Sequence, residues 1–356
     1  MYKEIHIQNF KNFEDIELSN LKRINLIAGK NSVGKSSVLE AIFLHCGAYN
    51  PALFFTILTL RGAKPIPPVA YGGGTPWDSF FHKFNTGTPI QISAVDLKYG
   101  VRRLTAGLLG PEALRQRRDF VPLPPEQQMS LEPIQQGTYS LELTSTGNEG
   151  VTQHYLIADP TGIKQSPIPL PPFPSIFISP RGGGSVNMAK RYSELEVRGE
   201  HVRFLQNLKK FEPRIRRLAS VLDGSDYTLY ADIGLRQMLP LSHVSNGAFL
   251  IASFITAIAS TKSGVVLIDE FENGIHFSLL KQVWKTLASV ARSYDVQLFV
   301  TTHSREAIIA AHSAFSETSP YDFTYHRLDQ TASGVRVVRY DKSDLETAQD
   351  INFEVR

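Results

Sequence analysis

The stretch Gly29–Ser36 reads Gly-Lys-Asn-Ser-Val-Gly-Lys-Ser, which is the spacing G-x-x-x-x-G-K-S of a phosphate-binding loop. Its glycines let the backbone curl so that several N–H groups point at one anion, and the N-terminus of the following helix adds to that field. Lys35 is expected to reach the β- and γ-phosphates of a nucleotide, and Ser36 is expected to ligate Mg²⁺. An ordinary glycine turn before a helix is the alternative. The expected nucleotide-binding residues are Gly29, Lys30, Asn31, Ser32, Val33, Gly34, Lys35, Ser36 and Ser37.

A second candidate site follows the apolar run Val265–Ile268, which is typical of a buried parallel strand and is followed at once by Asp269 and Glu270. Ligands of α/β sheets bind at the carboxyl ends of the strands. Asp269 is therefore expected to hold Mg²⁺, directly or through water, and Glu270 to act as general base on the attacking water. The alternative is a pair of acids at the N-terminus of a helix.

A third candidate residue, His303, follows the apolar strand Leu298–Thr301 and Thr302. Its position at the carboxyl edge of the sheet would bring a neutral imidazole to the γ-phosphate, where it can form a hydrogen bond and help to place the water. The alternative is an ordinary histidine that precedes a helix capped by Ser304.

The composition indicates an ordinary globular chain large enough for a sizeable core. The chain has 356 residues, of which 42% are hydrophobic and 20% charged, with a net charge of +3. This mild excess of positive charge does not require a polyanionic partner. A single cysteine, Cys46, excludes an internal disulfide and a multi-cysteine zinc site. The longest mostly apolar run, Ala248–Ala259, is shorter than the roughly 20 residues of a membrane span, so we expect a cytoplasmic protein without membrane contact.

Four segments are expected along the chain. Alternating residues predict strands over 1–28, and the proline- and glycine-rich middle contains candidate antiparallel strands at 90–98, 139–144 and 152–158. Residues 188–222 predict basic helices, and residues 226–241 predict a hairpin. The segments are 1–49, the N-terminal part of a nucleotide-binding domain with its phosphate loop; 50–174, an inserted β-rich lobe with proline and glycine loops; 175–241, a basic helical lobe and hairpin; and 242–356, the C-terminal part of the nucleotide-binding domain.

The last segment alternates between helices and strands. A helix from about 248, a strand at 265–268, a helix at about 275–291, a strand at 297–301 and a helix at 304–313 precede a hairpin at 322–340. Such alternation on both sides of an insert predicts an α/β fold with a largely parallel central sheet flanked by helices.

Together, these motifs resemble an ABC-type ATPase head. Their order and the long insert between them are similar to the RecF/SMC/OLD branch, whose stand-alone members are often described as AAA family ATPases. This resemblance rests on the sequences of three segments, Ile7–Phe13, Ile24–Asn31 and Asp269–His276. It implies a P-loop NTPase fold with a mixed central sheet, an inserted antiparallel β lobe and a helical lobe. It also implies ATP and Mg²⁺ as substrate and cofactor, and catalytic roles for Lys35, Glu270 and His303.

The resemblance implies a further element, a signature loop that contacts the γ-phosphate held by a second copy in a head-to-tail dimer. Its candidate residues, acting in trans, are Ser245, Asn246 and Gly247, which precede an apolar helix. Asn246 departs from the transporter pattern, which has a glycine there. A simple Ser/Asn helix cap is the alternative. The glutamine that links the Mg²⁺ site to the inserted lobe stays open among Gln91, Gln135, Gln136 and Gln153.

The head is expected to stand alone, because the insert is too short for an SMC-type coiled-coil arm and the residues after Ser313 are too few for the TOPRIM domain of OLD nucleases. By family analogy we expect an ATP-driven switch that forms dimers or higher oligomers and controls a separate nuclease or toxin, as in bacterial anti-phage systems. A RecF-like DNA clamp is an alternative, with nucleic acid bound through the basic segment 189–217. A nucleotide-gated scaffold with little turnover is another.

Overall fold

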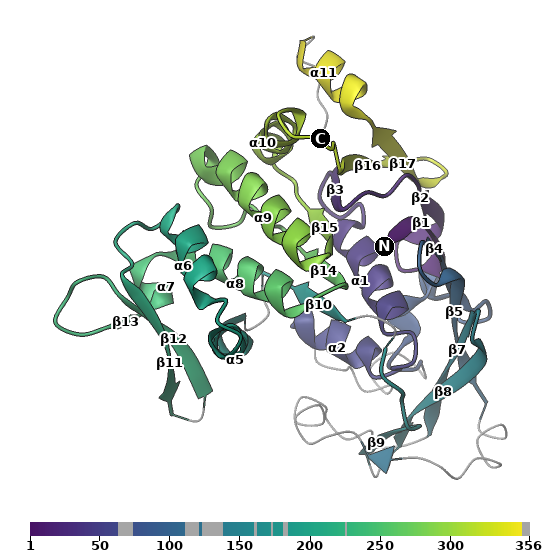
Figure 1. The fold of residues 1–356 in the computed structure, drawn as a ribbon. Helices are drawn as coiled ribbons and strands as arrows, with labels where there is room; N and C mark the ends of the chain where they lie inside the picture. Colours follow the sequence, from purple (N-terminus) through teal and green to yellow (C-terminus); the bar gives the residue numbers. More distant parts are fainter. Residues whose placement is uncertain are drawn as a thin grey trace. The chain divides into compact units, whose positions relative to one another are not determined.

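The computed structural model describes residues 1–62, 74–110, 121–122, 138–159, 162–171, 174–180, 184–224 and 226–350. The chain forms two compact units. Figure 1 labels the helices and strands of both. The first unit comprises Met1–Lys22, Gly29–Pro174 and His326–Arg339, and the second comprises Arg23–Ala28, Ser175–Tyr325 and Tyr340–Arg356. Among the described residues, no helix is both long and apolar enough to cross a membrane.

The first unit is built on an eight-stranded sheet with the order β2-β1-β4-β5-β7-β8-β9-β6. All its pairs are antiparallel. Its strands are β1 (Tyr2–Phe10), β2 (Phe13–Leu18), β4 (Ile90–Asp96), β5 (Gly100–Leu109), β6 (Val121–Pro122), β7 (Tyr139–Gly147), β8 (Gly150–Asp159) and β9 (Gly162–Gln165). The N-terminal strands β1 and β2 thus share one sheet with strands of the expected insert. The division of the chain into four segments stays a proposal.

The alternation that predicted these strands is visible in their burial. Ile5 and Ile7 of β1 are buried, whereas the residues between and around them are partly exposed. The strands predicted at 139–144 and 152–158 are present as β7 and β8, which form a hairpin and pair as far as Gly147 opposite Gly150. Parts of the predicted proline- and glycine-rich loops, together with Gln135 and Gln136, lie outside the described residues.

Helices α1 (Lys35–Cys46) and α2 (Leu53–Leu60) belong to the first unit, and α1 contacts β1 and β4. Glu40 of α1 is buried and forms ion pairs with Lys11 Nζ, at 2.7 Å, and with Arg61 Nε. Burial lowers the pKa of Lys11, while the Glu40 carboxylate opposes that shift. Because the Lys11 ammonium group is removed from water, its charge depends on the Glu40 carboxylate for compensation.

Two buried histidines also stabilise the first unit in their neutral form. His45 of α1 is hydrogen-bonded through Nδ1 to the Tyr2 hydroxyl at 2.8 Å. His326 of β16 (Phe323–Thr331) donates from Nε2 to the Ser19 carbonyl at 2.9 Å. Burial, with smaller effects of nearby cations, lowers the pKa of His45 to about 3 and that of His326 to about 4.

Four parallel strands of the second unit lie in the order β10-β14-β15-β3. In the six-stranded sheet, β16 and β17 (Gly334–Tyr340) follow β3. The parallel strands are β10 (Ser175–Ile178), β14 (Val265–Ile268), β15 (Gln297–Thr301) and β3 (Ile24–Gly29). Every residue of β14, β15 and β3 is buried, and most of these residues are apolar, as is typical of parallel strands covered on both faces. The predicted parallel core of the head is therefore confirmed.

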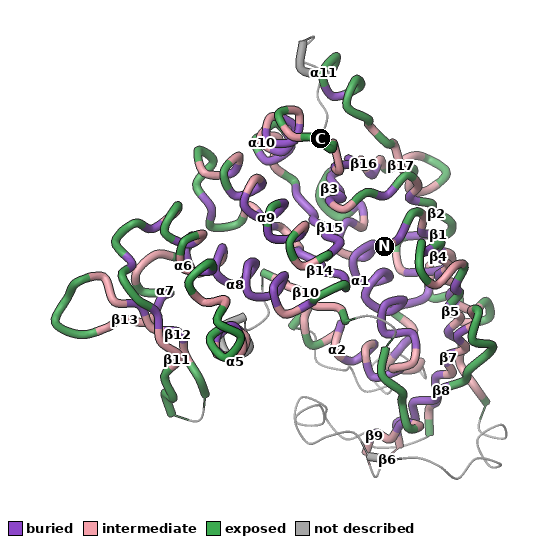
Figure 2. Tube along the Cα trace, in the orientation of Figure 1, coloured by how far each residue is buried: buried purple, intermediate pink, exposed green. Residues whose placement is uncertain are grey.

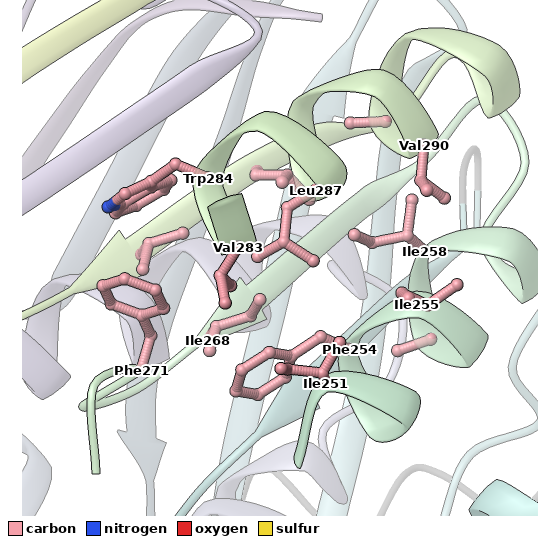
Figure 3. Close-up of a cluster of buried hydrophobic side chains, with 14 of the residues drawn as sticks. Ile251, Phe254, Ile255, Ile258, Ile268, Phe271, Val283, Trp284, Leu287 and Val290 are labelled. Carbon is pink, nitrogen blue, oxygen red and sulfur yellow. The ribbon is translucent and has the colours of Figure 1, made fainter. Parts of the chain in front are cut away.

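The core of the second unit lies between this sheet and the helices α8 (Asn246–Ser260) and α9 (Leu280–Tyr294). Figure 3 shows Ile251 and Phe254 of α8, Ile268 of β14 and Leu287 of α9 gathered in this core. α8 is buried along most of its length (Figure 2), which explains why its sequence is nearly all apolar. The helix α10 (Arg305–Ser316) packs against α9.

The helix predicted over 188–222 is correct only in its first half. The structure has α5 (Gly184–Val197) and α6 (His201–Lys209), and then β11 (Arg217–Asp223). Pro213 interrupts the helical pattern because it has no backbone N–H. β11 pairs with β12 (Asp226–Asp232), and β12 also pairs with β13 (Leu239–Pro240), so the main hairpin begins earlier than predicted.

Candidate nucleotide-binding site

The phosphate loop leaves β3 at Gly29 and enters α1 at Lys35. Gly29 has φ of 144° and Gly34 has φ of 111°, a region that residues with a side chain rarely adopt. A Cβ on Gly34 would lie 2.6 Å from Phe13 Cζ, and one on Gly29 would lie 2.5 Å from the Leu328 carbonyl oxygen. Both glycines are therefore required by the loop conformation and by the close approach of the chain around it.

Lys35, Ser36 and Ser37 form the first turn of α1. The Lys35 ammonium group donates to the carbonyl oxygens of Gly29, at 2.8 Å, and Lys30, at 2.9 Å. The first turn of α1 has no acidic residue, and no side chain caps its N-terminus. The positive end of the helix dipole is thus not neutralised by a local carboxylate, which suits an anion such as phosphate.

Asp269 and Glu270 follow β14 at its carboxyl end. The Thr301 hydroxyl, at the end of β15, donates to Asp269 Oδ1 and accepts from the Glu270 backbone N–H at 2.9 Å. Glu270 has φ of 49°, and Asn273 Nδ2 donates to its Oε2 at 2.7 Å. Neither acid caps a helix, because turns follow until the short 3₁₀ helix η4 (Phe277–Leu279).

The turn that carries Glu270 is anchored in the core of the second unit. Phe271 is buried, and its ring centroid lies 4.4 Å from that of Trp284 in α9. Figure 3 shows these two rings beside each other at one end of the core. Trp284 is itself fixed by a hydrogen bond of 3.1 Å from Nε1 to the Ala307 carbonyl. A buried aromatic residue directly after the acids therefore limits the movement of their backbone.

His303 lies two residues beyond β15 and precedes α10. Its backbone N–H donates to Glu272 Oε1 at 2.9 Å, and its ring Nδ1 lies 3.1 Å from the same oxygen. Ser304 caps α10 by accepting from the Ala307 backbone N–H at 3.1 Å, as the alternative from the sequence required. The cap and a role for the His303 ring are compatible, because they use different residues.

The strand register aligns the candidate residues at one edge of the parallel sheet. Ile268 of β14 pairs with Val300 of β15, so Asp269 and His303 follow neighbouring strand ends. Thr301 pairs with Ile27 of β3, and the chain enters the phosphate loop immediately after this strand. The carboxyl edge of an α/β sheet is where ligands bind, so the register supports a nucleotide site there.

Ser245, Asn246 and Gly247 lie at the N-terminus of α8. The Ser245 side chain accepts from the Ala248 backbone N–H at 3.2 Å, so it is an N-cap residue. Asn246 and Gly247 pack against Gly274, at which a Cβ would lie 2.6 Å from Asn246 Nδ2. The signature candidate and the turn after Glu270 are thus in contact within the second unit.

Asp269 offers a carboxylate at the carboxyl end of β14. Mg²⁺ is commonly held by one or two carboxylates together with substrate phosphates, so this side chain suits the ion. No group of three or more His, Cys, Asp or Glu residues that could hold a metal ion exists in the described part of the chain.

Sequence reasoning did not identify Thr301, Glu272, Asn273 or Gly274 as contributors to this site. Thr301 contacts Asp269 only because β14 and β15 are neighbours in a fixed register. Glu272 contacts His303 across 31 positions of sequence. The signal that could have found them is their position, since Thr301 ends a strand and the other three lie within five residues after Asp269.

The basic segment 189–217 is partly engaged in local contacts. Arg198 pairs with Glu194 at 3.5 Å, and Arg214 donates two hydrogen bonds to the Glu212 carboxylate. Arg203 donates to Ser293 Oγ at 2.7 Å. Other basic side chains in or beside α6 and β11 are exposed, namely Lys209, Lys210, Arg216 and Arg217. Lys190 of α5 is exposed as well, so a nucleic-acid contact through this segment would draw on these five side chains.

Two protein-family models match the chain. The model described as "AAA domain, putative AbiEii toxin, Type IV TA system" matches residues 186–310, and the model described as "AAA ATPase domain" matches residues 1–60. These segments contain the Asp269–Glu270 strand end, His303 and the phosphate loop. Both models describe AAA-type ATPase domains, which supports the ATP-hydrolysing activity that the resemblance implied.

Similar proteins differ in how much of the chain they cover. An ATP/GTP phosphatase of Helicobacter pylori is 23% identical over 334 residues, which cover 86% of each chain. The DNA replication and repair protein RecF of Clostridium acetobutylicum is 39% identical over 41 residues, or 12% of this chain and 11% of RecF. Among solved structures, the SmcHead bound to the C-winged helix domain of ScpA matches with a TM-score of 0.48 and 12% identity, covering 98% of this chain and 99% of that one.

Proposed function

We propose that this chain is a Mg²⁺-dependent ATPase that works as a molecular switch between two copies of itself. The observation that carries the proposal is the register of β14, β15 and β3, which brings Asp269, Glu270 and His303 to the sheet edge from which the phosphate loop departs. In this scheme Lys35 and the loop N–H groups bind the phosphates, and Ser36 and Asp269 hold Mg²⁺. Glu270 activates water, and His303 helps to place it.

A second copy would complete the site. Ser245, Asn246 and Gly247 begin α8, whose N-terminus has no acidic residue in its first turn and so suits a phosphate from a partner head. Their contact with Gly274 gives a route by which closure of the dimer reaches the turn after Glu270. ATP binding would then close a head-to-tail dimer or higher oligomer, and hydrolysis would reopen it.

The output of the switch is a separate effector, a nuclease or toxin, within bacterial anti-phage defence. Support comes from the family match over 186–310, whose description names an AbiEii toxin of a type IV TA system. Fold alone does not define function, so this part of the proposal needs its own test. When the tagged chain is purified from cells that also express a neighbouring gene, the product of that gene should co-purify with it. An ATPase-inactive variant should bind the same amount of that product.

The nucleotide chemistry is tested with two variants. Lys35→Ala should lose nucleotide binding, because it removes the cation that contacts the phosphates. Glu270→Gln should bind ATP with near-normal affinity but lose turnover, and it should accumulate a closed oligomer visible by light scattering. Normal hydrolysis by Glu270→Gln would contradict the assignment of the general base. Absence of steady-state turnover by the wild type would favour a nucleotide-gated scaffold instead.

A RecF-like DNA clamp is the second candidate, and the exposed residues Lys209, Lys210, Arg216 and Arg217 favour it. Phosphate contacts by these side chains would make DNA affinity fall steeply with salt. Binding to duplex DNA should be measured across a salt series with and without ATP, for the wild type and for a variant with Arg216 and Arg217 changed to Glu. A shallow slope that the variant leaves unchanged would exclude this candidate.

A further inference from the structure

Glu272 places a carboxylate against His303 in a way that the candidate roles above do not use. Its Oε1 accepts from the His303 backbone N–H at 2.9 Å and lies 3.1 Å from ring Nδ1. The Glu272 side chain is only 9% exposed, whereas that of His303 is 44% exposed. Glu272 Oε2 is buried and has no hydrogen-bond partner among the described residues. The side-chain hydrogen bonding of Glu272 is therefore directed at one residue, His303.

The chemistry of the two groups determines which ring nitrogen carries the proton. A carboxylate oxygen is negatively charged and only accepts hydrogen bonds, so an Nδ1 atom 3.1 Å from Oε1 is favoured to carry hydrogen rather than a lone pair. In the neutral ring, Nε2 then has the free lone pair and is an acceptor. The hydrogen bond from the His303 backbone holds the Glu272 carboxylate beside the ring, with Nδ1 as the nearer nitrogen.

We propose that Glu272 is a positioning residue that selects the Nδ1–H tautomer of His303 and presents Nε2 as an acceptor to the attacking water. This inference rests on the proposed ATPase function for its kinetic consequence, but the tautomer itself does not. Carboxylates that orient metal-bound imidazoles contribute about 10- to 100-fold to activity, and we expect an effect of the same size here. The contribution falls on turnover, because the water is engaged in the reaction rather than in binding of ATP.

The direct test is the protonation state of the His303 ring in the full chain, measured by ¹⁵N NMR at neutral pH. The His303 signal is assigned by its loss in His303→Gln. The wild type should show the Nδ1–H form. Glu272→Ala should shift the ring toward the Nε2–H form, and Glu272→Gln should retain Nδ1–H because its amide oxygen can still accept. Retention of Nδ1–H in Glu272→Ala would overturn the inference, whether or not the chain hydrolyses ATP.

The kinetic test separates positioning from a purely structural bridge between two loops. Glu272→Ala should lower kcat about 10- to 100-fold with little change in KM, and Glu272→Gln should recover most of that loss. In the His303→Gln background, Glu272→Ala should change kcat less than about twofold, because its effect acts through the ring. Additive losses in the double variant would overturn the proposal.

Glu306→Ala is the matched control. Glu306 is an acidic residue near His303, but its carboxylate accepts from the Ser304 hydroxyl rather than from the imidazole. This variant should leave both the His303 tautomer and kcat unchanged. An equal tautomer shift in Glu306→Ala would show that general loop charge, and not the Glu272 contact, controls the ring, and would contradict the proposal.

Discussion

Thr301→Val tests how the carboxylates at the sheet edge are held. The Thr301 side chain is fully buried and connects two strands, since its hydroxyl donates to Asp269 and accepts from the backbone N–H of Glu270. Valine has nearly the same shape but cannot form either bond. The substitution therefore removes the hydrogen bonds while leaving the packing of β15 almost unchanged.

The expected loss follows from the two groups left behind. A hydrogen bond to a charged group contributes about 1.5–3 kcal/mol, and an unsatisfied buried N–H costs about 1–3 kcal/mol. Asp269 is only partly buried and can recover part of its loss from water. We therefore expect the free energy of unfolding of the second unit to fall by about 2–4 kcal/mol, which is about 1–2 M in urea midpoint for a slope of about 2 kcal/mol/M.

The assay is urea unfolding followed by the fluorescence of Trp284, which is buried in the second unit. The chain has two tryptophans, so the measurement is made in a Trp77→Phe background. Thr256→Val is the matched control, because Thr256 is equally buried but donates only to the nearby Ser253 carbonyl. It should lose less than about 1 kcal/mol. Equal losses in the two variants would refute the reasoning.

Three further predictions concern the first unit. Gly34→Ala should weaken ATP binding at least about tenfold by calorimetry while the circular dichroism is unchanged, because a Cβ at a φ of 111° would collide with the Phe13 ring; wild-type affinity would contradict this. Glu40→Gln should lower the free energy of unfolding by about 3–5 kcal/mol by leaving buried Lys11 without its carboxylate, whereas Glu346→Ala, in an exposed pair, should cost less than about 1 kcal/mol. Below the ordinary histidine pKa near 6.5, the unfolded chain binds protons that His45 and His326 do not bind in the folded state. The free energy of unfolding should therefore fall, by about 1.4 kcal/mol per pH unit for each ring, as the pH drops from about 6.5 toward 4. Urea unfolding at pH 7 and 5 measures this slope, and equal midpoints would contradict it.

Much of the fold follows from local sequence patterns. The strands at 265–268 and 297–301 were predictable because four and three consecutive apolar residues, respectively, are bounded by short or polar ones. The hairpin at Gly147–Gly150 was predictable from its turn residues. β11 was not, because its apolar residues continue a helical spacing and only its pairing with β12 favours the extended form.

The candidate site was predictable where chemistry and chain position coincide. The phosphate loop and the pair Asp269–Glu270 could be named from sequence because their residue types and neighbours are local features. Thr301 and Glu272 could not be assigned roles, because their contacts depend on strand register and on the path of two turns. The joining of β1 and β4 in one sheet is likewise a long-range pairing that local patterns do not specify.

The central claim is that each ATP site is shared between two copies, and a mixing experiment tests it most directly. Lys35→Ala and Ser245→Arg should each be inactive alone. The first removes the lysine that binds the phosphates, and the second blocks the loop that would contact the nucleotide held by the other copy. In a head-to-tail dimer of one chain of each kind, one site contains both lesions and the other contains neither. An equimolar mixture should therefore recover about a quarter of wild-type ATP hydrolysis, since about half of the dimers are mixed and each has one intact site of two. No recovery on mixing, with both variants folded, would contradict the shared site.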